Sequence, residues 1–319
     1  MNLSNEEFQY RIKRLDRLSN MPIEFKVADA ENKILDSVNK YGIDSCCVAF
    51  SGGKDSLVLL HITRKLFPNI DYVFCNTTIE KPGNTSFIKK EYPDCNIMLP
   101  KKPPIEVIKK EGFPLFSKYI AGAIHDIQHS NKKNPKFPKK PKWLVNFIDE
   151  VLPILTEQEI KISGKCCYWL KKEPMERYVV HNNKLLTIRG IRASESRLRK
   201  LNYVRNTCFH YSDSIKTYVL EPLSIWTDED IWDYIRKNNI KYPDLYDKEF
   251  NRNGCLICGF GCIAPNGINS FRTTEKYYPT IYKKIIKKFQ YDKLLSIVDP
   301  WIRSQSIPHS SFGIWDGLK

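Results

Sequence analysis

The chain has 319 residues, with 51 Lys and Arg against 36 Asp and Glu, so its formal net charge is +15. At about 150 residues per domain, this length predicts one large domain or two modest ones. A hydrophobic content of 42% supports a packed core and excludes global disorder. No segment approaches the roughly 18 consecutive apolar residues of a membrane helix, and the N-terminus lacks an apolar signal region, so we expect a cytoplasmic protein with no membrane partner.

The positive charge and the ten cysteines narrow the classes of partner. A strongly basic chain suits anionic partners, such as nucleotides, nucleic acid or sulfated metabolites, without choosing among them. In a reducing compartment, clustered cysteines more often bind metal or do chemistry than form disulfides. We therefore expect metal or redox chemistry on an anionic substrate, and we leave formation of a homo-oligomer open.

The first half of the chain alternates helical and strand-like segments. The first forty residues are helical in pattern, with a capping box at Ser4 and Glu7 and a helix stop at Gly42. Short apolar strands are predicted at 46–50, 71–75 and 96–99. Strands that alternate with helices predict an α/β fold, a parallel twisted sheet with helices on both faces.

The second half continues the same pattern. Further strands are predicted at 185–191 and 216–223. Thr227, with Asp230 at the third helical position, predicts the start of a helix. A Lys-rich helix is expected near 280–289.

We divide the chain into three parts. Residues 1–42 form a helical N-terminal extension, 43–265 the main domain with an insertion near 113–160, and 266–319 a helical C-terminal tail. Within the insertion, residues 131–142 are dense in Lys and Pro. They predict an exposed loop, either a solvated linker or a basic contact surface for an anionic polymer.

A glycine-containing loop of sequence SGGKDS lies between the first strand and the next helix. Its residues are Ser51, Gly52, Gly53, Lys54, Asp55 and Ser56. The glycines let the backbone approach a ligand closely, and the N–H groups and dipole of the helix start favour an anion. Lys54 adds a point charge and Ser56 a hydroxyl donor. The spacing differs from the Walker pattern, but the loop predicts a phosphate site.

An arginine-rich segment follows the strand predicted at 185–191. Gly190, Arg192, Arg197 and Arg199 lie just beyond its end, where open α/β sheets bind ligands. Arginine suits bidentate recognition of phosphate or sulfate. The alternative is a solvated basic helix start, and Arg199 in particular could face solvent.

The cysteines form two groups. Cys166-Cys167 and the run Cys255-x-x-Cys258-x-x-x-Cys262 offer five candidate thiols, and a C-x-x-C turn beside glycines is a common metal knuckle. Four thiolates favour an iron–sulfur cluster or zinc about equally. The remaining cysteines lie in strand-like or isolated settings, where core packing is expected: Cys46, Cys47, Cys75, Cys95 and Cys208.

The SGGKDS loop resembles the pyrophosphatase-type loop of the adenine nucleotide alpha-hydrolase superfamily, the HUP-like PP-loop ATP pyrophosphatases. That superfamily includes ATP-dependent tRNA thiolases and the phosphoadenosine phosphosulfate (PAPS) reductase family. Segments 190–197, 221–226, 230–232 and 242–246 resemble the arginine motif and C-terminal half of the latter family, in the same order. On these motifs, residues 30–265 are identified as a member of the PAPS reductase family, which implies the superfamily's sheet and an adenine nucleotide as ligand.

The same resemblance extends to the cysteines. A Cys-Cys pair followed some ninety residues later by C-x-x-C is similar to the [4Fe-4S] set of adenylyl-sulfate (APS) reductases. The resemblance implies a C-terminal iron–sulfur subregion with Cys166, Cys167, Cys255 and Cys258 as ligands. Cys262 is then a redox thiol near the cluster or a buried structural thiol, unless it replaces one of the adjacent pair.

Two features depart from the reductases of this family. Those enzymes use a nucleophilic cysteine on a C-terminal tail, and here no cysteine follows Cys262. The loop also keeps the complete ATP-type pattern. Our leading expectation is therefore ATP-dependent adenylation of a substrate oxygen, followed by sulfur transfer. Lys54 would stabilise the leaving phosphates, Asp55 and Ser56 would hold Mg²⁺, and Arg192 and Arg197 would orient the nucleotide or an acidic substrate.

Two alternatives remain at this stage. One is reduction of PAPS or APS to release sulfite, with Cys262 or a partner thiol replacing the tail cysteine and a thioredoxin-like protein as reductant. The other is a nucleic-acid-binding factor with a structural cluster. The sulfur donor is unidentified, and tRNA or DNA is a candidate sulfur acceptor.

Overall fold

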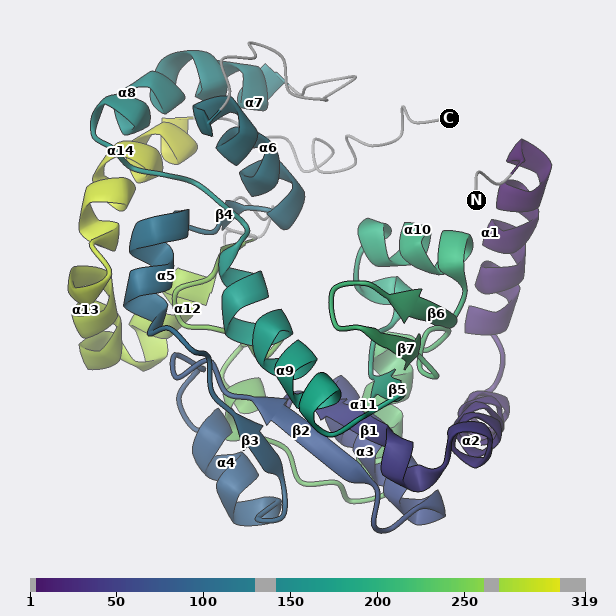
Figure 1. Ribbon diagram of the computed structural model, residues 1–319. Coiled ribbons are helices and arrows are strands. Elements are labelled where there is room, and N and C mark those ends of the chain that lie inside the picture. The colour runs from purple at the N-terminus through teal and green to yellow at the C-terminus, as the bar shows by residue number, and fades with distance from the viewer. Residues whose placement is uncertain (1–3, 130–141, 261–269, 305–319) are drawn as a thin grey trace.

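The fold centres on a six-stranded sheet with strand order β3-β2-β1-β5-β7-β6 (Figure 1). The computed structural model describes residues 4–129, 142–260 and 270–304. The strands of the main sheet are β1 (Cys46–Phe50), β2 (Asp71–Cys75), β3 (Asn96–Met98), β5 (Leu186–Arg189), β6 (Phe209–Ser212) and β7 (Thr217–Leu220). The pairs from β3 to β7 are parallel, which confirms the predicted α/β sheet, whereas β6 runs antiparallel to β7 at the edge.

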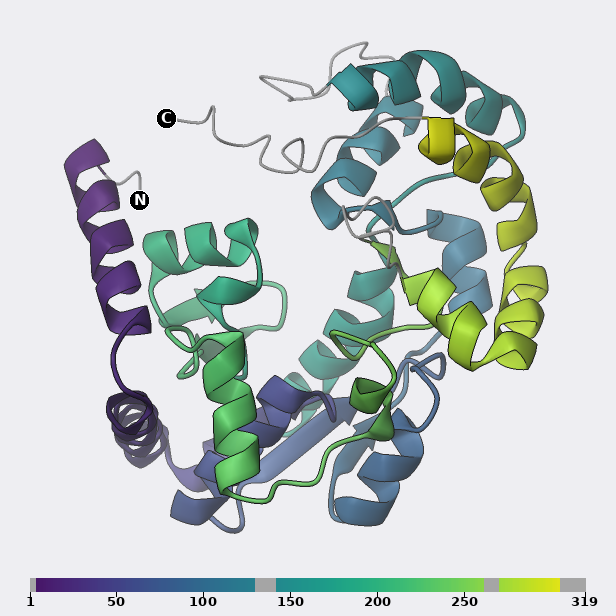
Figure 2. The same cartoon turned by 180° about the vertical axis from the view of Figure 1, so that it is seen from behind.

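Helices cover both faces of this sheet, as Figures 1 and 2 show from opposite sides. Strand β1 is nearly all apolar because alternate side chains enter different cores. Val48 and Phe50 pack in the core that includes α2 and α3, whereas Cys47 packs against α9. The helices are α1 (Asn5–Ser19), α2 (Ile23–Tyr41), α3 (Lys54–Leu66), α4 (Asn84–Glu91), α5 (Pro104–Glu111), α6 (Lys118–His129), α7 (Lys142–Asn146), α8 (Leu152–Glu157), α9 (Glu173–His181), α10 (Arg197–Asn206), α11 (Asp228–Lys237), α12 (Ser270–Tyr277), α13 (Pro279–Lys288) and α14 (Tyr291–Ser304).

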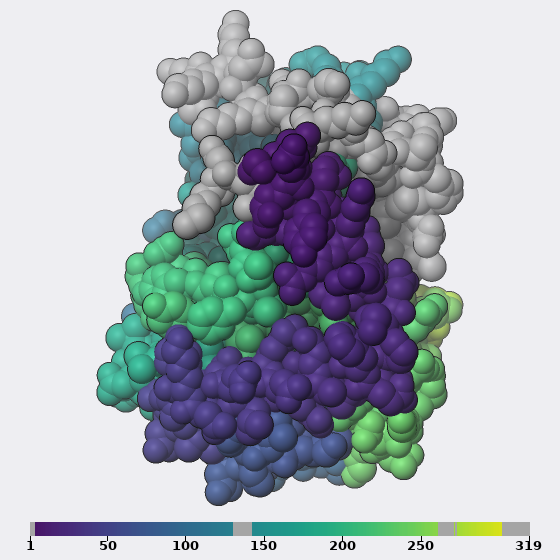
Figure 3. All heavy atoms as spheres, turned by 90° about the vertical axis from the view of Figure 1, so that its right-hand side faces the viewer, coloured from purple at the N-terminus to yellow at the C-terminus, as the bar shows by residue number. Residues whose placement is uncertain are grey.

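The N-terminal helices begin and end where the sequence indicates. Ser4 caps α1 by accepting from the Glu7 N–H at 3.1 Å, and α2 stops at Gly42, which has φ +81°. Helix α2 buries Ala30, Ile34 and Val38 in the main core. Figure 3 shows the purple N-terminal helices spread over the face of the molecule that they share with the green segment of α10. Arg11 of α1 donates to backbone carbonyls of α10.

A second hydrophobic core lies beside the sheet. It gathers helices α5 to α8 with α12 and α14, through contacts such as those of Phe147 with Phe116 and Trp301. A small two-stranded parallel sheet, β4 (Leu115–Phe116) with β8 (Gly259–Phe260), joins the insertion to the second half of the chain. The Lys/Pro-rich segment 131–142 lies outside the described residues except for Lys142. None of the described helices is long and apolar enough to cross a bilayer.

A buried ion pair fixes α11 against α2. The Lys26 side chain is 2% exposed and its Nζ donates to Asp230 Oδ2 at 2.5 Å. Asp230 also completes the predicted capping box, because its carboxylate accepts from the Thr227 N–H at 2.6 Å. The start of α11 is thus held by both a cap and a buried charge.

Replacing Lys26 with Met should lower the free energy of unfolding by about 3–5 kcal/mol, because Asp230 would keep a buried charge without its partner. Urea unfolding measures the change. Lys33→Met is the matched control. Lys33 forms a partly exposed pair with Asp29 on the same helix, so the free energy of unfolding of this variant should fall by less than about 1 kcal/mol. Equal losses of unfolding free energy in the two variants would show that burial of the Lys26–Asp230 pair does not increase its contribution to stability.

Candidate functional site

The SGGKDS loop lies at the point where the strand order reverses. It joins the carboxyl end of β1 to α3, and β1 has β2 on one side and β5 on the other. Open α/β sheets bind ligands in the crevice outside the carboxyl ends of the strands at such a switch point. The segment after β5, which carries Arg192, begins at the same edge, because β5 runs parallel to β1.

The backbone of the loop is held in a shape that only glycine fits. Gly52 has φ +70°, and a Cβ there would lie 2.5 Å from Asn84 Oδ1. The Asn84 and Asn253 amides both donate to the Ser51 carbonyl, at 3.1 and 2.9 Å. Two side chains from distant segments therefore fix the carbonyl at the start of the loop.

The hydroxyls of the loop are engaged within it. Ser56 Oγ donates to the Gly53 carbonyl at 2.8 Å and lies 3.0 Å from Ser51 Oγ. The Lys54 N–H, at the start of α3, donates to Tyr246 Oη at 3.0 Å. These contacts close the turn, and the Lys54 side chain is not part of them.

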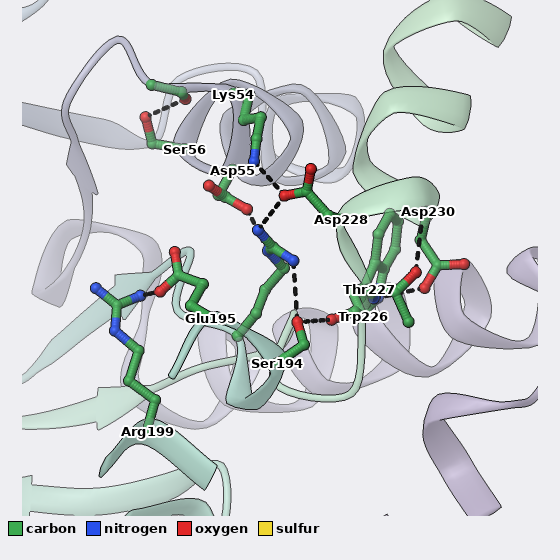
Figure 4. A network of polar contacts seen from close by, with 12 residues as sticks. Lys54, Asp55, Ser56, Ser194, Glu195, Arg199, Trp226, Thr227, Asp228 and Asp230 are labelled. Atoms are coloured by element: carbon green, nitrogen blue, oxygen red, sulfur yellow. Dashed lines mark hydrogen bonds and ion pairs between the residues drawn. The ribbon is translucent and has the colours of Figure 1, made fainter. Parts of the chain in front are cut away.

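Two buried cations and two carboxylates meet beside the loop (Figure 4). Lys54 is 4% exposed and Arg192 3% exposed. Lys54 Nζ donates to Asp228 Oδ1, and Arg192 Nη2 donates to the same oxygen at 2.7 Å. Arg192 Nε donates to Asp55 Oδ1. In Figure 4, Lys54, Asp55 and Asp228 point toward one another from α3 and α11.

The Arg192 guanidinium has a fixed orientation. Its Nη1 donates to Ser194 Oγ at 2.9 Å, and that hydroxyl donates to the Trp226 carbonyl at 2.8 Å. Behind it, a Cβ at Gly190 would lie 2.8 Å from the Asp55 carbonyl oxygen, so the end of β5 packs directly against the start of α3. The predicted Gly190 and Arg192 therefore both belong to the loop's surroundings.

The other arginines of this segment lie elsewhere. Arg197 begins α10 and is exposed. Arg199 forms an ion pair with Glu195, so it is not simply solvent-facing. The structure thus brings one arginine of the predicted set into the polar network of the loop and places the other two on α10.

Two cavities flank the loop. One of about 580 Å³ is lined by Arg192 and Asp228 together with the aromatic side chains of Trp232, Tyr246 and Phe250. The other, of about 240 Å³, lies over the ends of β1 and β2. Its lining includes Phe50, Ser51, Phe74, Cys75, Glu80 and Lys171. A ligand bound at the loop can therefore extend to either side.

The two cysteine pairs are brought together by backbone pairing. Phe113 bridges to Ile162, and the adjacent β4 pairs with β8. The segment at 113–116 thus holds the chain just before Cys166-Cys167 on one side and the chain just after Cys258 on the other. The Cys258 N–H donates to the Cys255 carbonyl at 3.2 Å, which is the turn expected of a C-x-x-C knuckle.

The thiols interact with one another and with a nearby lysine. A hydrogen bond with Cys167, together with burial, raises the pKa of Cys166, and the same bond lowers the pKa of Cys167. Burial raises the pKa of Cys255 to about 12. Negative charge on Cys255 raises the pKa of Lys171, against the effect of burial.

The four paired cysteines have the chemistry that a metal group needs, because four thiols from two paired segments are the donor set of an iron–sulfur or zinc centre. Among residues 4–129, 142–260 and 270–304, however, no three His, Cys, Asp or Glu side chains already stand close enough together to hold a metal ion. The fifth candidate thiol, Cys262, lies outside the described residues.

The other cysteines are packing residues or lie apart from the pairs. Cys46, Cys47 and Cys95 are buried, and burial raises their pKa values to about 11, 12 and 12. Cys75 and Cys208 are half-buried, and Cys75 lines the smaller cavity with its pKa raised by burial to about 12. Their raised pKa values make the thiols of Cys46, Cys47, Cys75 and Cys95 poor nucleophiles at neutral pH.

Four residues of the site were not singled out by the sequence analysis: Asn84, Asp228, Tyr246 and Asn253. Tyr246 lies within a motif that the resemblance covers, and Asp228 directly follows the recognised cap Thr227. That position on a helix start beside a phosphate loop was a usable signal. Asn84 and Asn253 carry no local pattern, because their role depends on long-range contact with the Ser51 carbonyl.

Comparison with known proteins agrees with this geometry. The phosphoadenosine phosphosulfate reductase domain matches residues 45–121 and 145–259, more than half of the chain. The chain belongs to this family. Its matched region contains the loop, Arg192 and the four paired cysteines, so the PAPS reductase family resemblance of these motifs is confirmed.

Three individual proteins illustrate the likeness. An uncharacterized protein of Methanocaldococcus jannaschii is 27% identical over 284 residues, which cover 84% of this chain and 55% of that protein, so this chain spans about half of its length. An adenosine 5'-phosphosulfate reductase of Staphylococcus haemolyticus is 25% identical, covering 68% and 71%. The crystal structure of a PAPS reductase from Candida auris, a phosphate complex, is 14% identical, with a TM-score of 0.44, covering 80% and 97%.

Changing Gly52 to Ala in the loop of this PAPS reductase-family protein should lower the free energy of unfolding by about 1–3 kcal/mol. The backbone there has φ +70°, and the new Cβ would meet Asn84. Thermal or urea unfolding measures the loss. Gly122→Ala is the control, since Gly122 lies in α6 with open space around it and alanine should stabilise a helix interior by about 0.5–1 kcal/mol. A neutral Gly52→Ala would contradict the assigned backbone geometry.

Proposed function

We propose that this PAPS reductase-family protein is an ATP-dependent enzyme that adenylates a substrate oxygen and then transfers sulfur, with an iron–sulfur cluster at the paired cysteines. The observation that carries the proposal is the pair of buried cations, Lys54 and Arg192, beside the start of α3. A polyphosphate bound there meets two charge-assisted donors and the positive end of a helix dipole. The intact loop suits a leaving pyrophosphate.

The chemistry of the first step follows from these positions. The substrate oxygen attacks the α-phosphorus of ATP, the new oxygen–phosphorus bond forms, and the bond to the β-phosphate bridging oxygen breaks. Pyrophosphate leaves with the electron pair, and Lys54 and Arg192 stabilise its developing charge. Asp55 and Ser56 remain the proposed Mg²⁺ ligands, because Mg²⁺ prefers carboxylate and phosphate oxygens. A sulfur nucleophile then displaces AMP from the adenylated substrate.

The smaller cavity suits the nucleoside part of the substrate. It opens over the ends of β1 and β2, and Phe50 and Phe74 provide apolar walls while Ser51 joins it to the loop. It also reaches Lys171, whose charge interacts with the paired cysteines. A nucleotide that enters this cavity would extend from the loop toward the cysteine pairs, which is the path that a coupled sulfur transfer requires.

The proposed cluster is a [4Fe-4S] centre held by Cys166, Cys167, Cys255 and Cys258. When bound, such a group supplies a redox or sulfur-binding centre beside the nucleotide. The chain's own contribution is to hold the two pairs together through the pairing of 113–116 with the segments before Cys166 and after Cys258. Lys171 contributes a positive charge that favours ionised thiols.

A second candidate function is reduction of PAPS or APS to sulfite and the free nucleotide. Relatives named as adenosine 5'-phosphosulfate reductases support it. The same two cations would then bind the sulfonucleotide phosphates. A cysteine thiolate, from Cys262 or from a partner protein, would attack the sulfur, and a thioredoxin-like dithiol would release sulfite and be oxidised to a disulfide.

Incubation with ATP, PAPS and APS separately should distinguish the two functions. We expect ATP, with the acceptor substrate present in a cell extract, to yield AMP and pyrophosphate, and PAPS and APS to yield no sulfite. Lys54→Met should lower the rate of ATP turnover about 100-fold or more, because the positive charge that stabilises the leaving pyrophosphate is lost. Lys65→Met, on the exposed end of the same helix, is the control and should keep activity. Sulfite from PAPS or APS without turnover of ATP would overturn the proposal in favour of reduction.

Anaerobic purification followed by iron and sulfide analysis should show a cluster that depends on the paired cysteines. Cys255→Ser and Cys258→Ser should each lose most of the iron and its visible absorption, whereas Cys208→Ser, a half-buried cysteine of the other group, should retain both. Cys262→Ser separates the roles of that thiol: loss of iron makes it a ligand, and loss of turnover with iron retained makes it a reacting group. A protein that carries zinc or no metal would refute the iron–sulfur assignment.

A further inference from the structure

The charges beside the loop balance before any ligand is present. Lys54 and Arg192 carry two positive charges, and Asp55 and Asp228 carry two negative charges in direct contact with them. A polyphosphate that joined this set would bring excess negative charge into a site that is already neutral. Its binding therefore requires one of the carboxylates to leave or to be compensated.

The two carboxylates differ in their freedom to leave. The Asp55 side chain is 18% exposed, and the Asp55 backbone packs directly against the end of β5. The Asp228 side chain is 59% exposed and lies on the wall of the 580 Å³ cavity. Rotation of Asp228 toward water opens the space between the two cations, whereas Asp55 has no comparable route.

The capping box of α11 does not use the Asp228 side chain. It is the first residue of α11, and the cap of that helix is made by its neighbours: the Asp230 N–H donates to Thr227 Oγ1 at 3.2 Å, and Asp230 accepts from the Thr227 N–H. Lys26 anchors Asp230 from behind. The backbone is thus held firmly while the Asp228 side chain is left to interact with the loop.

The Asp228 carboxylate is ionised at neutral pH. Burial opposes its charge, but the hydrogen bonds and charges of Lys54 and Arg192 outweigh that effect and lower its pKa. A carboxylate offers the same kind of acceptor oxygen as a phosphate, and one of its oxygens accepts from both cations here.

We infer that Asp228 is an internal anion: in the nucleotide-free protein it occupies the place between Lys54 and Arg192 that a substrate phosphate takes, and that phosphate displaces it. The inference rests on the proposed phosphate-binding function of the loop. Asp228 keeps the buried cations paired while the site is empty, and its displacement reduces the net affinity for every anion. Polyphosphates offset this loss of affinity better than small monovalent anions, because they have several acceptor oxygens.

The test measures binding of inorganic pyrophosphate by calorimetry, in the full chain and without divalent metal. Asp228→Asn and Asp228→Ser should each bind pyrophosphate about tenfold or more tightly than the unaltered protein, since a hydrogen bond between charged groups corresponds to at least that factor. Glu229→Gln is the matched control, because it removes the same charge from the next, exposed position of α11. Its affinity should stay within about twofold of the unaltered protein, the change expected of a screened surface charge.

A second readout checks the role of Asp228 in the empty site. Without ligand, both Asp228 variants should unfold at a lower temperature than Glu229→Gln, and saturating pyrophosphate should remove most of the difference. Two variants are used so that a folding defect in one does not decide the result. Unchanged or weaker pyrophosphate binding in the folded Asp228 variants would overturn the inference, since it would make Asp228 a neutral neighbour or a direct ligand.

The outcomes separate this inference from the proposed function. Tighter pyrophosphate binding in the Asp228 variants, combined with failure to convert ATP to AMP, would keep the internal anion and reject ATP as substrate. Conversion of ATP together with equal pyrophosphate affinities would keep the proposed function and reject the internal anion. No pyrophosphate binding in the unaltered protein or in any of the variants would reject the internal anion, and the ATP assay would then decide the proposed function by itself.

Discussion

Burial of two cations at one edge of the sheet is the constraint on which the site depends. Lys54 and Arg192 come from the segments after β1 and β5, and both are nearly inaccessible to water. Charges buried to this degree need partners, because desolvation otherwise outweighs any gain. Asp55 and Asp228 provide them, which explains why α11 must begin where it does. The cap at Thr227 and the pair between Lys26 and Asp230 place that helix start, so contacts far from the loop determine its electrostatics.

Hydrogen bonds connect the same loop to the segment that carries Cys255. The Asn253 amide donates to the Ser51 carbonyl, and two residues later Cys255 forms an antiparallel bridge to Glu80 beyond the end of β2. The Lys81 N–H donates to the Gly254 carbonyl at 3.0 Å, and the Leu256 N–H donates to the Ile79 carbonyl at 2.8 Å. This short pairing holds the first cysteine of the knuckle beside the strand ends that form the smaller cavity. The segment from Asn253 to Cys255 therefore contacts the SGGKDS loop at one end and carries a proposed cluster ligand at the other.

Much of the sheet and the loop follows from local sequence, and the network around the loop does not. CCVAF, a glycine turn and an apolar helix predict β1, the loop and α3 because strand burial and helix starts leave local patterns. Strand β6 (Phe209–Ser212) was missed because its mixed polar sequence suits an edge strand and shows no apolar run. Strands β4 and β8 have two residues each, too few for any periodicity, yet their pairing brings the cysteines together. Asn84 and Asp228 act through partners more than thirty residues away in sequence, so their roles needed the fold.

If the loop binds a nucleotide as proposed, the long-range contacts are also where this fold would discriminate among nucleotides. Lys54 and Arg192 follow β1 and β5, and in the proposed function they pair with phosphate whatever else the ligand carries. Discrimination must then come from groups that are not fixed by the sheet, and the structure supplies two. In the internal-anion proposal, Asp228 would set how much negative charge a ligand must bring to enter between the cations. In the proposed function, the segment from Asn253 to Cys258 would lie next to the far end of the ligand. Both reach the loop through one or two side-chain contacts, so substitution in these segments can alter substrate and chemistry while the fold is kept.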